Sequence, residues 1–542
     1  MKNSVIIFGF VITIFLSTSL SAQHYDNDPP AIPLKSFSVP MFGKDIIIHD
    51  QPDRDQRNIA VCSAFNGWLF ATYSYFDGEF LNLSLLKSTD NGITWEVLAE
   101  GGFGGGGSVV PKVDIVANGT NLSDLMLFQG VGYFSNEMEV GSVYIWRIQA
   151  EPFEFKDRIV DPDCYIKDFA LATDNLYPAY NSNPYSVGIL YSKEGYKDTL
   201  IFLSSMDGGV TFNNRRVVAT SSNFIHKVAL NYGRSPSWSG GRYFATWEEQ
   251  LYQQSDRGHI FTSHTEPNIN SPFTFPVCLD SLDPGSINNA RNPIIACQFN
   301  DTDNDSANLT EIVMFEKYIP NLDRYNIAGY YNLQATNSKF FRNFFFAPSP
   351  DNRLQADINF NPFNSTFMLT YFDSNNYELP FITHDLNMKN PDSWTTVSSG
   401  YNDNSNITSP CPKVKLNTFH QDGMNVWIAD KPDGKGIALF DAPFSTYTGI
   451  SKINNINGTI LFGAFPNPCV STTNIIFEID RQQRVTISIY NILGQFEECI
   501  TNQIFPPGKH KVKSDIHELS PGTYIYTLDT ENFSATGKIV VL

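Results

Sequence analysis

The sequence contains few cysteines, and none are spaced as in a structural zinc site. Seven cysteines are spread singly along 542 residues, without a Cys-x-x-Cys pair. Since closely spaced cysteines are the usual sign of structural zinc, no such site is predicted. Cys62 and Cys297 lie in apolar runs, which favours buried free thiols over a disulfide.

Positive charge is also scarce. The 37 lysines and arginines are outnumbered by 56 acidic residues, which gives a formal net charge of −19. This balance argues against nucleic acid or an anionic membrane surface as a partner. A hydrophobic fraction of 42% against 17% charged residues indicates a packed protein rather than a disordered chain.

Long apolar runs are lacking beyond the N-terminus. Residues 1–22 have a basic start, a short apolar stretch over Val5–Leu16 and small residues before Gln23, as a secretory signal peptide does. No later segment reaches about 18 consecutive apolar residues, so no transmembrane segment is expected in the mature chain. We therefore predict an exported protein.

Amphipathic helical patterns are missing as well, and residues 40–450 alternate short strand patterns with turn clusters. A motif recurs at Trp68–Tyr73, Arg242–Trp247 and Thr366–Tyr371. Its spacing fits a repeat of about 58–62 residues, which predicts an all-β propeller of about seven blades, with six or eight as alternatives. Lys44–His49 is expected to add a closing strand to the last blade.

An eight-residue pattern occurs twice, at 88–95 and 205–212, between apolar runs. In such a turn an aspartate accepts backbone N–H groups, a glycine supplies positive φ and an aromatic ring packs on a neighbouring sheet. The residues that carry the pattern are Ser88, Asp90, Gly92, Thr94 and Trp95, and Ser205, Asp207, Gly209, Thr211 and Phe212. The pattern resembles the Asp-box (BNR) hairpin of sialidases and many other β-propellers, which implies a structural turn away from the ligand face.

The composition changes after a polar linker at 451–463. Residues 464–542 show alternating strands and predict a small Ig-like β-sandwich. Its characteristic residues are Pro466, Asn467, Pro468, Gly494, Gly522, Tyr524, Gly537 and Lys538. The segment resembles the C-terminal sorting domain (type A) of the type IX secretion system of Bacteroidetes. The resemblance implies handling by that secretion machinery and a secreted or outer cell-surface location.

One acidic segment has the carboxylate spacing of a calcium loop. Asp301, Asp303 and Asp305 alternate, but the sixth position is Ser306 rather than glycine, and Glu311 falls one place short. A calcium site and a solvated hairpin tip are the two interpretations. No cofactor is otherwise required.

Three residues are candidates for ligand binding. Arg57 and Arg291 each open a strand, and the resemblance to sialidases implies arginines that bind a carboxylate, for which the guanidinium fork is suited. Glu248 offers a carboxylate beside Trp247. A third arginine, a nucleophile and an acid are not identified.

These observations favour an exported module that binds a glycan or a protein. A glycoside hydrolase of sialidase type and a structural, adhesin-like surface component are the alternatives. The glycine run Gly101–Gly107 lacks the residues of a phosphate-binding loop and is predicted to be a loop between blades.

Overall fold

In the computed structural model the described residues are 35–36, 45–442 and 459–541. Shorter gaps within these ranges lie at 52, 106–107, 136–139, 160–164, 175–182, 213, 235–240, 252–254, 256, 267–269, 281–288, 299–309, 333–340, 347–351, 363–364, 375–376, 386–393, 399–406, 418–421, 466–471, 480, 492–494, 517–518, 521 and 531–533. The segments predicted as signal peptide (1–22) and calcium loop (Asp301, Asp303, Asp305) lie outside the described residues.

The described residues form nine β-sheets and one short 3-10 helix, η1 (Leu122–Asp124), which confirms the all-β prediction. Sheets 1 to 3 contain, in order, β3 (Asp55–Ser63), β4 (Leu69–Phe76), β5 (Phe80–Ser88) and β6 (Glu96–Gly105); β7 (Ser108–Asn118), β8 (Met126–Ser135), β9 (Val140–Ala150) and β10 (Phe153–Arg158); and β11 (Ile166–Thr173), β12 (Val187–Lys193), β13 (Asp198–Ser205) and β14 (Arg216–Ser221). Among these residues, no helix is long and apolar enough to cross a membrane.

Sheets 4 to 7 follow the same plan, and the last two also take a strand from the N-terminal region. They contain β15 (Phe224–Gly233), β16 (Arg242–Gln250), β17 (His259–His264) and β18 (Val277–Cys278); β19 (Ala290–Cys297), β20 (Glu311–Ile319), β21 (Arg324–Asn332) and β22 (Phe341–Phe345); β23 (Arg353–Asn361), β24 (Thr366–Asp373), β25 (Phe381–Asp385), β26 (Trp394–Ser398) and β1 (Lys35–Ser36); and β27 (Lys413–Asn417), β28 (Asp422–Asp430), β29 (Gly436–Asp441) and β2 (Ile46–Ile47). Strand β2 pairs antiparallel with β29, at the place predicted for a closing strand.

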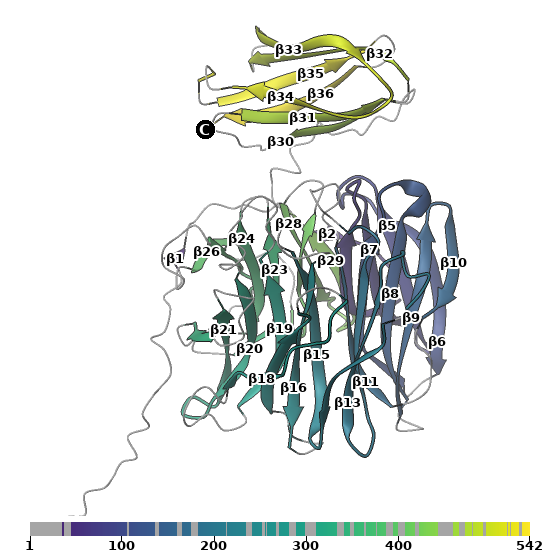
Figure 1. Cartoon of the computed structure of the whole chain (residues 1–542), viewed down its shortest axis with the longest axis vertical. Coiled ribbons are helices and arrows are strands. Elements are labelled where there is room, and N and C mark those ends of the chain that lie inside the picture. The colour runs from purple at the N-terminus through teal and green to yellow at the C-terminus, as the bar shows by residue number, and fades with distance from the viewer. Residues whose placement is uncertain are drawn as a thin grey trace, which may run out of the picture.

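The first strand of each sheet contacts the first strand of the next. The contacts run from β3 through β7, β11, β15, β19 and β23 to β27, and β27 returns to β3. Figure 1 shows these sheets standing side by side. Because the first strands begin at intervals of about 60 residues, the observed repeat agrees with the spacing of the sequence motif.

The recurring sequence motif marks the second strand of a sheet. It falls on β4, β16 and β24. Within it, Thr72 and Thr246 are fully buried, and each hydroxyl donates a hydrogen bond to a carbonyl of the third strand, Ser84 or Phe261. The threonine hydroxyl is thus satisfied within its own sheet, while the aromatic residues next to it in the motif pack between the sheets.

Hydrophobic cores lie between neighbouring sheets. Leu86 of sheet 1 shares one buried cluster with Val426 and Phe440 of sheet 7. Because each sheet buries both faces, its strands are apolar on both sides, which accounts for the high aromatic content.

Gly101–Gly105 belong to a strand, although the sequence predicted a loop. These glycines are part of β6 and pair with Phe80–Leu83 of β5. Glycines have no side chains to pack, so backbone pairing with β5 holds this segment in the sheet.

The C-terminal region contains two further sheets that share one core. Sheet 8 contains β30 (Thr459–Phe465), β31 (Thr472–Ile479) and β34 (Gly508–Asp515), and sheet 9 contains β33 (Phe496–Phe505), β32 (Gln483–Asn491), β35 (Gly522–Asp529) and β36 (Ser534–Val541). Phe477 of sheet 8 and Ile487 of sheet 9 are fully buried in that core. Strand β30 begins inside the stretch 451–463 that was predicted as linker, because the apolar residues after Gly458 pair with β31.

Candidate functional site

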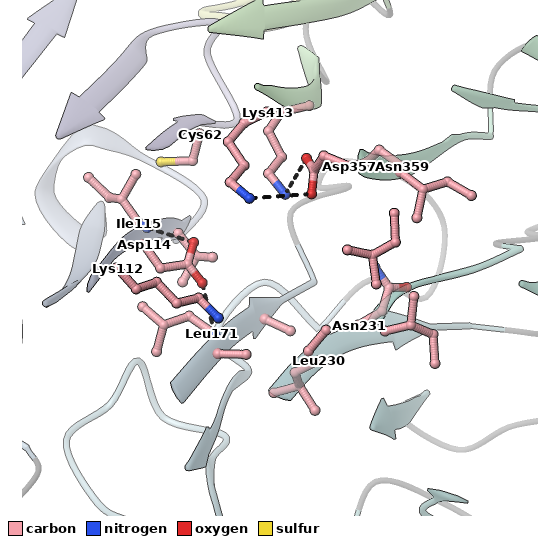
Figure 2. A pocket seen from close by; sticks show the side chains of 18 of the residues that line it. Cys62, Lys112, Asp114, Ile115, Leu171, Leu230, Asn231, Asp357, Asn359 and Lys413 are labelled. Atoms are coloured by element: carbon pink, nitrogen blue, oxygen red, sulfur yellow. Dashed lines mark hydrogen bonds and ion pairs between the residues drawn. The ribbon is translucent and has the colours of Figure 1, made fainter. Parts of the chain in front are cut away.

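The first strands of sheets 1 to 7 surround one cavity of about 430 Å³. A cavity of this size is in the range of small-molecule sites. Figure 2 shows Lys112 and Asp114 on one side of it and Asn231 and Asn359 on the other, with Asp357 next to Asn359. Each of the seven sheets contributes residues to its wall.

Six of the seven first strands carry a β-bulge near their start. A bulge bends the strand and redirects side chains. In three sheets the bulge residue has positive φ and an amide side chain, and all three line the cavity: Asn58 (46°), Asn292 (52°) and Gln355 (53°). Asparagine tolerates this conformation better than most residues, so the residue type fits the backbone at positions 58 and 292.

Carboxylates connect neighbouring sheets at five places, from sheet 2 through to sheet 7. Each accepts a hydrogen bond from a backbone N–H of the following first strand, and three of these donors, Val228, Asn292 and Gln355, lie at or next to a bulge. The pairs are Asp114 with Leu171 (3.1 Å), Asp168 with Val228 (2.9 Å), Glu248 with Asn292 (3.0 Å), Glu316 with Gln355 (2.8 Å) and Asp357 with Val414 (3.0 Å). These carboxylates therefore hold neighbouring sheets together.

Two of these carboxylates also bind lysines of the cavity wall. Lys112 Nζ lies 3.4 Å from Asp168 Oδ1, and Lys415 Nζ lies 3.4 Å from Asp357 Oδ2, with Lys413 at 3.9 Å. Burial lowers the pKa of Lys112, although Asp168 opposes the shift. Burial acts in the same direction on Lys415, but the carboxylates of Asp357 and Asp114 together outweigh it, so the pKa of that ammonium is raised.

Three other side chains of the wall have groups available to a ligand. Lys227 has no partner for its ammonium among the described residues. Asn231 and Asn359 use their Oδ1 atoms to accept backbone N–H groups of Cys297 and Phe360, which leaves their NH2 groups free of acceptors in the described part of the chain. Lys227, Asn231 and Asn359 thus present hydrogen-bond donors, and donors suit a ligand rich in oxygen acceptors.

Two thiols of the wall are buried among apolar residues. Cys62 and Cys297 are free and buried, as the sequence predicted, and burial raises the pKa of both well above its ordinary value. A thiol that stays protonated is a poor nucleophile.

The predicted arginines occupy equivalent positions on two sheets, and neither is among the residues that line the cavity. Arg57 precedes the bulge of β3 and lies 2.9 Å from Asp55. Arg291 precedes the bulge of β19, lies 2.7 Å from Glu316 and covers the ring of Tyr325 at 3.7 Å. No arginine is found among the described residues of the cavity wall, so the arginine cluster implied by the sialidase resemblance is not assembled there.

Glu248 is almost fully buried in β16. It accepts hydrogen bonds from Gln250 Nε2 and from the backbone N–H of Asn292, next to Arg291. Burial raises the pKa of this carboxyl. The structure thus places Glu248 near Arg291, between sheets 4 and 5, whereas Arg57 lies on sheet 1.

The two eight-residue patterns form the same hydrogen-bonded turn between the third and fourth strands of sheets 1 and 3. In the first, Asp90 accepts from Ser88 Oγ, Thr94 N and Thr94 Oγ1 at 2.6–2.9 Å, and Gly92 N donates to Ser88 Oγ. Trp95 packs edge-on against Phe440 of sheet 7. The aspartate therefore organises a turn and has no free oxygen directed at the cavity.

The second copy repeats these bonds. Asp207 accepts from Ser205 Oγ, Thr211 N and Thr211 Oγ1, and Gly209 N donates to Ser205 Oγ. Burial tends to raise the pKa of Asp207, but the hydrogen bonds from Thr211 and Ser205 outweigh it and lower that pKa. Phe212 packs against the cluster shared by sheets 2 and 3.

Several C-terminal motif residues have structural roles. Tyr524 donates its hydroxyl to Ser520 O at 2.9 Å, close to Gly522 at the start of β35. A Cβ at Gly537 would lie 2.3 Å from the Tyr526 ring, so only glycine fits there. Lys538 lies within β36, and Pro466, Asn467, Pro468 and Gly494 lie outside the described residues.

A buried acid outside the cavity predicts a dependence of stability on pH. Glu311 accepts a hydrogen bond from Thr262 at 3.0 Å, and burial raises the pKa of its carboxyl to about 7. Below pH 4.5 the carboxyl is protonated in both the folded and the unfolded state, so its ionisation does not change the free energy of unfolding. Between pH 4.5 and 7 the unfolded state loses this proton first, so stability falls as pH rises.

We expect Glu311→Gln to be more stable than the wild type above pH 7 by about 2–3 kcal/mol, and to show little difference at pH 4.5. Urea unfolding of both proteins at the two pH values measures this. Burial lowers the pKa of His264 to about 4, which makes stability rise with pH. Both proteins contain His264, so this effect cancels when their stabilities are compared. An equal difference at both pH values would contradict the assignment.

The charged residues of the cavity wall were missed from the sequence. The signal that could have found them is a lysine or an aspartate within an apolar first strand, repeated about every 60 residues. The residues are Lys112, Asp114, Asp168, Asp357, Lys413 and Lys415. Buried charges need partners, and the next sheet in the repeat would have been the place to look for them.

Comparison with known families identifies the C-terminal module. Residues 463–542 match the secretion system C-terminal sorting domain. This domain indicates export, followed by secretion or attachment at the outer surface, and handling by the type IX secretion machinery. No curated protein sequence is significantly similar to this chain.

Similar solved structures are distant. A protein of unknown function from Dyadobacter fermentans has 12% identity, with 75% of this chain and 99% of that chain covered, and a TM-score of 0.37. The endosialidase of phage phi92 has 9% identity, 79% and 72% coverage, and a TM-score of 0.37. A mutant of the NanB sialidase of Streptococcus pneumoniae has 9% identity, 76% and 71% coverage, and a TM-score of 0.40. Likeness at this level assigns no activity to this chain.

Proposed function

We propose that this exported protein is a seven-bladed β-propeller whose central cavity binds a glycan. The observation that carries the proposal is the cavity of about 430 Å³, which has walls from all seven first strands and free donors from Lys227, Asn231 and Asn359. The contacts that run from β3 around to β27 and back support a closed ring of blades. In this proposal the two aspartate-bearing turns are Asp-boxes.

The size and chemistry of the cavity favour a glycan over a protein partner. A recess enclosed by seven strands admits the end of a chain molecule rather than a broad protein surface. Sugar hydroxyl and carboxylate oxygens accept hydrogen bonds from ammonium and amide groups, and bonds to a charged donor contribute about 1.5–3 kcal/mol each. A purely structural surface role would leave these donors without a purpose.

Binding is favoured over hydrolysis of the sialidase type. A glycosidase needs two carboxyl groups with separate roles, one of them kept protonated in an apolar environment. Asp114, Asp168, Glu316 and Asp357 instead accept backbone N–H groups, and three of them also pair with a lysine or an arginine. We therefore expect no turnover of a fluorogenic sialoside by the purified protein, and measurable turnover would favour the hydrolase.

The binding proposal is tested with Lys227→Met. A glycan array with the full-length protein identifies a ligand, and calorimetry measures its affinity. We expect Lys227→Met to weaken binding at least about tenfold, because it removes a charged donor from the cavity. Lys197→Met is the control, since Lys197 is exposed on the hairpin between β12 and β13. A silent array, or equal affinities of the two variants, would contradict the proposal.

A further inference from the structure

Three side chains with metal-binding atoms meet at the outer edge of sheet 4. They are His259 on β17, Cys278 on β18 and Asp280 just after β18, and their ligand atoms all lie within 4.8 Å of one another. His259 Nδ1 is 2.6 Å from Asp280 Oδ2, and Cys278 Sγ is 3.4 Å from Asp280 Oδ1. None of them lines the central cavity.

The pairing of β17 with β18 fixes this arrangement. Phe261 pairs with Cys278, and Leu279 N donates to Ile260 O at 2.8 Å. Ile260 N in turn donates to Asp280 Oδ1 at 3.1 Å, which orients the carboxylate. The backbone thus places the imidazole, the thiol and the carboxylate together before any ion arrives.

We propose that His259, Cys278 and Asp280 bind a zinc ion. Imidazole nitrogen, thiolate sulfur and carboxylate oxygen are the three donor types that zinc uses in proteins, and this mixed set excludes calcium and magnesium, which take oxygen ligands. Three protein ligands leave a fourth tetrahedral position for water. Metal–ligand bonds of about 2.0–2.3 Å bring ligand atoms to roughly 3.5 Å from one another, so only the close His259–Asp280 pair must widen.

Burial and charge are compatible with this role. The side chain of Asp280 is 4% exposed, whereas that of His259 is 28% exposed and Cys278 is half-buried, so an ion has a route of entry from solvent. Two anionic ligands and a neutral imidazole would neutralise the ion. Ile260, whose N–H holds Asp280, supplies the outer-shell support that metal-binding carboxylates commonly have.

Without metal the same groups form an ion pair. The hydrogen bond to Asp280 raises the pKa of His259 to about 10, so the imidazole is protonated at neutral pH. Zinc must displace that proton, and its affinity therefore increases with pH. The prediction that no zinc site exists rested on the lack of paired cysteines, a criterion that does not cover a site with a single cysteine.

The site is tested by titrating metal-free, full-length protein with Co²⁺ as a spectroscopic substitute for zinc and with Zn²⁺ by calorimetry. We expect one ion per chain and a thiolate-to-cobalt charge-transfer band that is lost in Cys278→Ser and His259→Gln. Cys499→Ser is the matched control, because Cys499 is an exposed free thiol far along the sequence. A band that persists in Cys278→Ser, or that disappears in Cys499→Ser, overturns the proposal.

A second measurement uses the unmodified chain and does not depend on a variant that folds. Alkylation followed by mass spectrometry compares the thiols with and without Zn²⁺. We expect zinc to slow the modification of Cys278 at least tenfold and to leave Cys499 unchanged. Equal rates at Cys278 with and without zinc, or no saturable binding up to millimolar zinc, would also overturn the site.

Discussion

Gly209→Ala is expected to lower the free energy of unfolding of the seven-sheet region by about 3 kcal/mol. Gly209 has φ of +79°, and a Cβ there would lie 2.4 Å from the ring of Phe128 in sheet 2. Two costs combine: strain of a non-glycine residue at positive φ, and overpacking against a buried ring. Phe128 is itself fully buried, so its ring cannot move aside cheaply.

Gly434→Ala separates these two costs. Gly434 has φ of +81°, but no atom lies within 4 Å of its Cβ position. Only the backbone strain remains, and we expect a loss of about 1 kcal/mol. Urea unfolding followed by tryptophan fluorescence is the measurement, because all seven tryptophans lie before residue 451 and do not report on the C-terminal module. Equal losses in the two variants would contradict the contact between the turn and sheet 2.

Asp174→Ala is expected to cost about 3–5 kcal/mol, because it breaks a buried ion pair by removing one of its two charges. Asp174 Oδ2 lies 3.4 Å from Arg234 Nη1, with side-chain exposures of 0% and 2%. The same oxygen accepts the backbone N–H of Asn183 at 2.6 Å. The carboxylate thus connects the ends of β11 and β15 with the segment before β12.

Asp157→Ala provides the comparison for this ion pair. Asp157 pairs with Arg147 at 2.8 Å, a shorter distance, but its side chain is 46% exposed. Solvent screens such a pair, so the loss is expected to stay below about 1 kcal/mol. The double variant Asp174→Leu with Arg234→Leu should recover most of the loss, since a buried pair replaced by apolar residues is often neutral. A loss in Asp174→Ala no greater than that in Asp157→Ala would contradict the assigned burial.

The turns were predictable because all their polar partners lie within eight residues. Asp90 meets Ser88 and Thr94, and Asp207 meets Ser205 and Thr211, so local sequence contains the whole hydrogen-bonded unit. The repeat could likewise be found from the buried second-strand motif, since every sheet meets similar neighbours. Only the packing partners, Phe440 and Phe128, come from distant parts of the chain.

The cavity was not predictable in the same way. Lys112 and Asp168 are 56 residues apart, and each resembles an ordinary exposed charge in its own strand. Their pairing depends on which strands of neighbouring sheets lie side by side, and a local pattern does not contain that information. The arginine hypothesis failed to include the partners of the arginines. Arg57 and Arg291 have the expected strand position, but each forms an ion pair with an acidic residue of its own sheet.

The cluster at sheet 4 shows a further limit of spacing rules. Cys278 and Asp280 form a local pair, but His259 is separated from them by the loop between β17 and β18. Only the pairing of those two strands brings the histidine into contact. A rule based on paired cysteines therefore passes over a site of mixed ligands.

The central claim is that the first strands of seven sheets enclose the ligand site, and lysine footprinting tests it most directly. The full-length protein is treated with a small amine-reactive reagent, with and without a glycan identified on the array, and modified lysines are quantified by mass spectrometry. We predict that the glycan protects Lys227 in the cavity and leaves Lys197 on the outer hairpin unchanged. Protection of Lys197 with full reactivity at Lys227 would place the ligand elsewhere and contradict the account.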